Sequence, residues 1–152
     1  MRGKLLLLLA GIAIAAIAAC AGYFVLRKET IAHDGYRKAL AAVAGAKKLV
    51  LLNFTGTDWC TGCIILEKQI FEKPTVRKFS REHLETVVVD FPLGVSADSE
   101  SEKQNLLLQE KFRVLGFPTL ILVDSSGHEL ARSDGTKFKG PEDFIAWVES
   151  VQ

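Results

Sequence analysis

The sequence predicts an α/β sandwich of three layers, with helices covering both faces of a central mixed β-sheet. Two short apolar runs have the composition of buried strands, and helical patterns alternate with them along the chain. Towards the end, two more strand patterns are joined by a tight turn, which indicates a hairpin. The predicted order is helix, strand, helix, strand, helix, strand, strand, helix.

The first half of the predicted domain contains a strand with one helix before it and two helices after it. Residues 33–48 are rich in alanine and carry apolar residues at helical spacing. Residues 49–54, LVLLNF, form a short apolar run that is typical of a buried central strand. Residues 60–71 again place apolar side chains on one side of a helix, and the proline that opens residues 74–83 predicts another short helix.

The second half supplies the remaining three strands and two helices. Residues 85–91, ETVVVDF, are β-branched and predict a second buried strand. A helix is predicted over residues 99–112. Residues 116–135 predict strand, turn and strand, with Ser125–Gly127 as the turn. Residues 140–152 predict a last helix, with acidic residues in its first turn, where the helix dipole favours them.

The N-terminal segment, residues 1–28, has the features of an export signal or membrane anchor. Two basic residues precede the apolar run at residues 5–26, which is long enough to cross a bilayer as a helix, since that takes about 20 residues. Three outcomes remain open: cleavage after Ala21, lipidation of Cys20, and retention as an anchor. Each places the remaining domain, residues 29–152, outside the cytoplasm, where disulfides form.

Composition excludes several classes of function. The formal net charge is +1, whereas a nucleic-acid-binding protein needs a basic face for phosphates. Three cysteines are too few for a scaffold held together by disulfides, and a domain of this size has no need of one.

Cys60 and Cys63 lie at a predicted junction between a strand and a helix. Free N–H groups and the dipole at a helix start favour a thiolate at Cys60, and the thiolate is the nucleophile. Cys63 lies one turn further on the same helix face, which puts the two Cα atoms about 5–6 Å apart, within disulfide geometry. We expect an exposed Cys60 to attack a substrate disulfide and a more buried Cys63 to resolve the mixed disulfide.

Other uses of a cysteine pair fit less well. A zinc site needs four ligands, and His33, His83 and His128 are scattered rather than placed at ligand spacing, so we expect no metal site. Haem attachment needs a histidine directly after the second cysteine, where Ile64 stands. A structural disulfide rarely joins cysteines with two residues between them. Redox chemistry is therefore the favoured interpretation.

Residues 49–151 resemble the thioredoxin superfamily. The stretch LVLLNFTGTDWCTGC looks like its first core strand and Trp-Cys-x-x-Cys site, and VLGFPTLILVDSSGHELARSDG looks like its later cis-proline segment. The resemblance implies that Cys60 is the nucleophile and Cys63 the resolving thiol. It also implies that Trp59 shields and orients the site, and that Pro118 is a cis-proline preceded by Phe117, whose backbone pairs with the substrate. X–Pro is the one bond where cis costs little.

Two departures from the thioredoxin pattern concern the proton on Cys63. The buried aspartate of typical thioredoxins aligns with Asn53, which cannot take a proton, and its lysine partner aligns with Thr86. Proton removal then falls to water or to Asp58. The alternative for Asp58 is a solvated loop acid or a helix cap.

An apolar cluster follows the second predicted strand. It comprises Phe91, Pro92, Leu93 and Val95. Two interpretations stay open: the cluster forms part of a face that docks a partner, or it folds back onto the core.

Together these features predict an exported thiol–disulfide oxidoreductase, similar to secreted or periplasmic Dsb-type reductases. Small, uncharged Thr61 and Gly62 bring no cation to the Cys60 thiolate, which favours a reductant over an oxidant. We expect a monomer that acts on protein disulfides, needs no cofactor, binds no nucleic acid, and is re-reduced by a membrane or periplasmic electron-donor thiol protein. The alternatives are an oxidase or isomerase with the same residues, or a thiol-based module for copper delivery or cytochrome maturation.

Overall fold

A computed structural model describes residues 34–94 and 99–152 of the chain. Four strands form one sheet in the order β2-β1-β3-β4. Strand β1 pairs in parallel with β2 and antiparallel with β3, and β3 pairs antiparallel with β4, so the predicted mixed sheet is confirmed. The strands are β1 (Leu49–Thr55), β2 (Leu84–Asp90), β3 (Thr119–Val123) and β4 (Glu129–Asp134).

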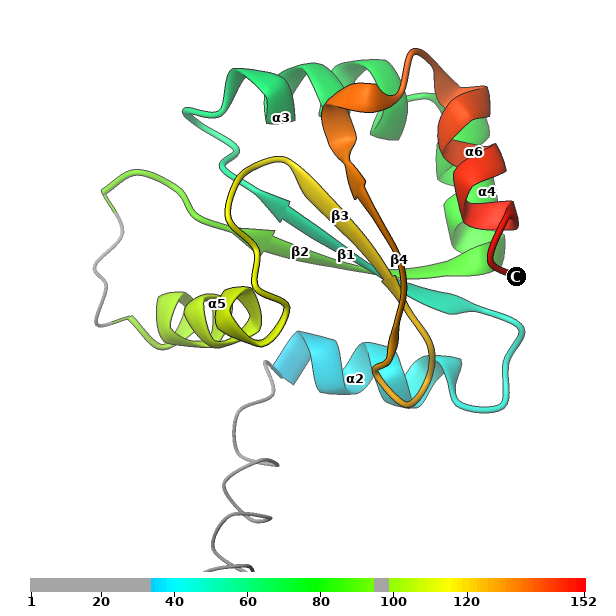
Figure 1. Cartoon of the computed structure of the whole chain (residues 1–152), viewed down its shortest axis with the longest axis horizontal. Coiled ribbons are helices and arrows are strands. Elements are labelled where there is room, and N and C mark those ends of the chain that lie inside the picture. Colours follow the sequence, from blue (N-terminus) through cyan, green and yellow to red (C-terminus); the bar gives the residue numbers. More distant parts are fainter. Residues whose placement is uncertain (1–33, 95–98) are drawn as a thin grey trace, which may run out of the picture. The chain divides into compact units, whose positions relative to one another are not determined.

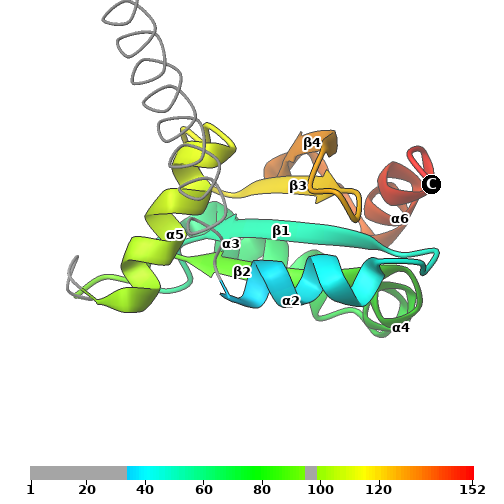
Figure 2. The same ribbon diagram turned by 90° about the horizontal axis from the view of Figure 1, so that it is seen from below.

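Helices cover both faces of this sheet, as Figures 1 and 2 show. Helices α2 and α5 lie on one face, and α3, α4 and α6 lie on the other, so three layers are present as predicted. The α-helices are α2 (Asp34–Val43), α3 (Thr61–Leu66), α4 (Pro74–His83), α5 (Glu100–Lys111) and α6 (Pro141–Glu149). A π-helix, η1 (Glu67–Phe71), continues α3, and a short 3-10 helix, η2 (Gly135–Lys137), follows β4.

The sheet is buried on both faces, which explains why its central strands are almost wholly apolar. On the face of α2 and α5, Phe112 meets the rings of Tyr36 and Phe54 edge-on. On the opposite face, Phe144 of α6 is fully buried and packs edge-on against Phe71. The buried residues on this second side are Leu51, Leu66, Ile70, Val76, Leu84, Leu120, Leu122, Phe144 and Val148.

Two predicted helices differ from the structure. The first was predicted to reach residue 48 but ends at Val43, and Gly45 then takes a left-handed backbone with φ of 78°. Glycine adopts this conformation at little cost and commonly follows a helix end. The helix predicted over 60–71 begins at Thr61, with Cys60 as its N-cap, and changes to π geometry after Leu66.

The predicted export segment, including the run at 5–26, Cys20 and Ala21, lies outside the described residues. The predicted boundary at residue 28 lies outside them as well. Within residues 34–94 and 99–152, no helix is long and apolar enough to span a bilayer.

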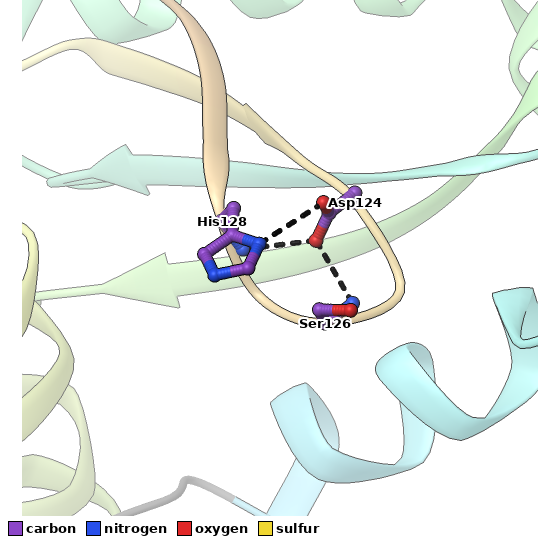
Figure 3. A network of polar contacts seen from close by, with 3 residues as sticks. All are labelled: Asp124, Ser126 and His128. Carbon is purple, nitrogen blue, oxygen red and sulfur yellow. Dashed lines mark hydrogen bonds and ion pairs between the residues drawn. The ribbon is translucent and has the colours of Figure 1, made fainter.

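The turn between β3 and β4 is held by one carboxylate, as Figure 3 shows. Asp124 Oδ1 accepts hydrogen bonds from the N–H groups of Ser126 at 2.8 Å and His128 at 2.9 Å. The bond from His128 is the main cause that lowers the pKa of Asp124. Below this turn Tyr36 is fully buried, and burial, followed by the charge of Asp124, raises its pKa to about 12.

We predict that Tyr36 makes stability depend on pH in the alkaline range. Its folded pKa of about 12 exceeds the ordinary value of 10.0, so the folded state holds the phenol proton more tightly than the unfolded chain. This contribution to stability is complete below pH 10 and is lost as the pH rises towards 12. Urea unfolding at several alkaline pH values measures the free energy of unfolding. This free energy should fall less with rising pH in Tyr36→Phe than in the natural chain, and an equal fall in both would show that Tyr36 is not the group responsible.

Candidate active site

Cys60 and Cys63 form a disulfide at the start of α3. Their Cα atoms are 5.2 Å apart and the sulfurs are bonded at 2.06 Å, so the pairing predicted from their spacing is confirmed. Cys60 is the N-cap residue, and its Sγ accepts a hydrogen bond from the N–H of Cys63 at 3.2 Å. The Cys60 sulfur therefore lies where free N–H groups and the helix dipole stabilise negative charge, which favours a thiolate there after reduction.

The two cysteines differ little in exposure. Cys60 is 7% exposed and Cys63 is 4% exposed. Cys63 is therefore the more buried of the two, as expected, but Cys60 is itself buried and not exposed as expected. The disulfide turns the Cys60 sulfur back onto the helix end. A substrate sulfur that reaches it must therefore come into contact with the side chains around it.

Pro118 lies against the cysteine motif. The Phe117–Pro118 peptide bond is cis, as the resemblance implied. A Cβ added to Gly62 would come within 3.2 Å of Pro118 Cδ, and one added to Gly135 would come within 3.2 Å of Pro118 Cγ. The proline ring thus sits between two glycines, and Gly135 N–H also donates to the Pro118 carbonyl at 3.3 Å. This packing brings the cis-proline to the Cys60–Cys63 helix.

Trp59 is fixed in one orientation beside the cysteines. Its indole N–H donates to the Phe91 carbonyl at 2.7 Å, and its ring meets that of Phe117 edge-on, with centroids 5.9 Å apart. A Cβ on Gly56 would come within 2.5 Å of the indole, so the ring lies directly over the Gly56 backbone. Trp59 remains 44% exposed, so part of its ring lies at the protein surface. Its orienting effect on a substrate stays a prediction.

Asp58 holds a loop in place. Its carboxylate accepts from the N–H of Leu93, with N–O distances of 2.9 and 3.2 Å. The helix N-cap position belongs to Cys60, so Asp58 is not the cap. A proton relay through Asp58 stays a prediction.

Residues 36–152 match the family described as the thioredoxin-like domain. The chain belongs to the thioredoxin-like family.

Individual relatives refine this assignment. The chain is 36% identical to the disulfide bond reductase DsbH of Chlamydia pneumoniae over 118 residues, which are 78% of this chain and 70% of that protein. It is 33% identical to the thiol:disulfide interchange protein DsbD of Pectobacterium atrosepticum over 109 residues, which are 72% of this chain but 17% of that protein. A solved structure of a DsbH oxidoreductase matches with a TM-score of 0.70 and 34% identity, covering 76% of this chain and 80% of that one. With the Cys60–Cys63 disulfide, these similarities make this thioredoxin-like chain a thiol–disulfide oxidoreductase of the Dsb type.

A cavity of about 180 Å³ lies behind Cys63 in this thioredoxin-like domain. Asn53 lines it from β1, is 7% exposed, and its Oδ1 has no hydrogen-bond partner among the described residues. The residue paired with Asn53 on β2 is Val88, whereas Thr86 pairs with Leu51 and lines an adjoining cavity. Asn53 therefore places a buried polar group, but no proton acceptor, behind Cys63.

The sequence interpretation missed Glu67, which lines both of these cavities. Glu67 lies one helical turn after Cys63, and its N–H donates to the Cys63 carbonyl. Glu67 is an exposed residue, but partial burial of its carboxyl group raises its pKa, nearby Glu72 raises it further, and Arg77 opposes both. The i+4 spacing from Cys63 was the available signal, because residues at that spacing share a helix face.

We predict that Gly135→Ala destabilises the domain. The new methyl group would lie 2.6 Å from Leu66 Cδ2 and 3.2 Å from Pro118 Cγ, both in a packed region. Overpacking of this kind costs about 1–3 kcal/mol of unfolding free energy. Denaturant unfolding of the oxidised protein measures the loss.

A matched control is Gly116→Ala, because a Cβ there would meet nothing within 4 Å. This variant should unfold within about 0.5 kcal/mol of the natural chain, as exposed substitutions usually do. Equal stability of both variants would show that the contact beneath Pro118 is not tight.

Proposed function

We propose that the chain is an exported thiol–disulfide oxidoreductase that mainly reduces protein disulfides. The observation that carries the proposal is the Cys60 sulfur, bonded to Cys63 at the N-terminus of α3. Thr61 and Gly62 add no cation that would stabilise the Cys60 thiolate further, and a less stabilised thiolate makes a weaker oxidant. The name of the DsbH relative, disulfide bond reductase, supports the same direction.

The reaction proceeds through two exchanges. In the reduced protein the Cys60 thiolate attacks one sulfur of the substrate disulfide, forms a mixed disulfide and releases one substrate thiolate, which takes up a proton. Cys63 then loses its proton and attacks Cys60 Sγ, which releases the second substrate sulfur as a thiol. Two electrons pass from the dithiol to the substrate, and the protein ends with the Cys60–Cys63 disulfide of the present structure.

Glu67 is suited to accept the proton of Cys63. The strand position behind Cys63 is Asn53, which has no basic group, whereas Glu67 is an acidic residue that lines the same cavity. Its raised pKa makes it a better proton acceptor than an ordinary carboxylate, provided that the pH is high enough to keep it ionised.

The proposal includes a partner and a location. The oxidised protein must take two electrons from a membrane or periplasmic thiol protein before it can act again. Residues 1–28 serve as the signal or anchor, with residues 5–26 in the membrane if they are retained, and residues 29–152 act as a monomer in the periplasm.

We predict that the full-length chain, kept in detergent and re-reduced by dithiothreitol, catalyses the reduction of insulin disulfides. Cys60→Ser should abolish turnover because it removes the nucleophile. Cys63→Ser should also block turnover, but the Cys60 thiol would remain joined to the substrate, and this mixed disulfide is visible on a non-reducing gel.

The direction of electron flow is tested by equilibrating the cysteine pair in glutathione buffers. A reductase should have a potential nearer thioredoxin, about −270 mV, than DsbA, about −120 mV. A value near the DsbA end would overturn the reductase assignment in favour of an oxidase.

We predict that Glu67→Gln slows the second exchange. A positioned proton acceptor contributes at least about 100-fold, so release of the substrate from the mixed disulfide should slow by about that factor. Stopped-flow measurement of product release, after formation of the mixed disulfide, follows this step separately from the first exchange.

Glu72→Gln is the matched control, because Glu72 lines the same cavity but lies two helical turns beyond Cys63. Its release rate should fall far less than that of Glu67→Gln, because it removes only one of the causes that raise the pKa of Glu67 and leaves the acceptor itself in place. If the two variants release substrate at the same rate, Glu67 is not the acceptor.

A further inference from the structure

The segment after β2, residues 91–93, lies beside the active site. Strands β1 and β2 run in parallel, so the loops that leave them share one edge of the sheet, as Figure 1 shows. We call residues 91–93 the flanking segment and residues 56–59 the cysteine loop. Phe91 is half-buried and Leu93 is 69% exposed. Residues 91–93 therefore belong to the surface around the disulfide, whereas Val95, the last member of the predicted apolar cluster, lies outside the described residues.

Two carboxylates join the flanking segment to the cysteine loop, one from each side. Asp90, at the end of β2, accepts from Thr57 N–H at 2.9 Å and from Thr57 Oγ1 at 2.7 Å. Asp58, in the cysteine loop, accepts from Leu93 N–H. Hydrogen bonds to an ionised acceptor are the stronger kind, so this reciprocal pair holds the two backbones together.

Phe91 extends the connection to the cis-proline. Its carbonyl accepts the indole N–H of Trp59, and its ring stacks on Phe117 with centroids 5.1 Å apart and planes at 26°. Asn105, buried in α5, donates to the Asp90 carbonyl at 2.6 Å and anchors the start of the segment. The flanking segment, the cysteine loop and the residue before Pro118 are thus fixed relative to one another.

We propose that Phe91 and Leu93 form a specificity-determining wall that binds a large apolar side chain next to a cysteine of the protein substrate. Asp58 and Asp90 are positioning residues that hold this wall beside Cys60. The inference rests on the proposed function, because it requires a protein disulfide to react at Cys60.

The occupant follows from the small exposure of Cys60. Since the residue is only 7% exposed, a substrate sulfur that bonds to it must bring the neighbouring residues of its chain against the surrounding surface. That surface includes large apolar groups beside the exposed polar residues Thr57 and Thr61: Trp59 is 44% exposed and Leu93 is 69% exposed. The nearby carboxylates of Asp58 and Asp90 already accept bonds from the two loops. Exposed apolar groups at a place where a partner must dock favour apolar side chains of that partner.

The test compares two peptide disulfides, each a dimer joined through one cysteine. The sequences Ala-Leu-Cys-Gly-Lys and Ala-Ser-Cys-Gly-Lys differ only beside the cysteine. With dithiothreitol to re-reduce Cys60 and Cys63 after each reaction, and its uncatalysed rate subtracted, the full-length chain should reduce the leucine peptide with a kcat/KM about 10-fold higher, the scale of one apolar side chain in a pocket. Leu93→Ser should bring this ratio close to one. Leu130→Ser should preserve it, because Leu130 is another exposed leucine, 42% exposed, that lies on β4.

The role of the carboxylates is tested separately. Asp90→Ala should lower the same ratio by raising KM for the leucine peptide, and Asp90→Asn should restore it, since its amide can still bond Thr57 N–H and Oγ1. Asp124→Ala is the matched control, because that carboxylate also accepts bonds from backbone N–H groups but holds the β3–β4 turn in Figure 3. It should leave the ratio unchanged.

The outcomes separate this inference from the proposed function. The wall would be wrong if the natural chain reduced both peptides with the same kcat/KM, or if Leu93→Ser left the ratio of the two values unchanged. Neither result would count against the oxidoreductase activity itself. If Asp90→Ala and Asp90→Asn lower the ratio of the two kcat/KM values equally, Asp90 does not position the wall. Failure to reduce either peptide would overturn the proposed function, and the inference with it.

Discussion

The active site depends on strand β1, which is paired on both edges and covered on both faces. Six of its seven residues, all but Leu49, are buried. Because β2 and β3 fix its position, the point where β1 ends at Thr55 fixes the start of α3 and hence the Cys60 sulfur. Strand β3 runs the opposite way, so its beginning meets the same sheet edge and carries Pro118 there. The order and direction of the strands thus bring the two cysteines and the cis-proline to the same edge of the sheet.

Much of this arrangement was predictable because its signals are local. Apolar β-branched runs indicated buried strands, and the two-residue spacing of Cys60 and Cys63 placed them within bonding reach on one helix end. The cis bond before Pro118 followed from the resemblance and not from the residues alone. The helix predicted to reach residue 48 was too long, because an alanine-rich pattern does not reveal where Gly45 turns left-handed.

The parts that the sequence did not reveal are contacts between distant segments. Asp58 bonds the backbone of Leu93, 35 positions away, and Thr57 bonds Asp90 across 33 positions, so neither partner was visible from a local pattern. The cavity that brings Glu67 together with Asn53 also needs the strand and helix to be packed first. Exposure of Cys60 was overestimated for a similar reason, since the bonded sulfur turns onto the helix end.

The β3–β4 turn is a suitable place to split the chain into two fragments. Ser125 and Ser126 are exposed and lie at the opposite end of β3 from Pro118. A cut between them leaves both cysteines and the cis-proline on one fragment, while the other fragment carries β4 and α6. The second piece still contributes Gly135 beneath the proline ring and Phe144 to the core. Exposed polar loop tips tolerate such breaks best, so a split version of this enzyme would regain its catalytic surface only when the two pieces associate.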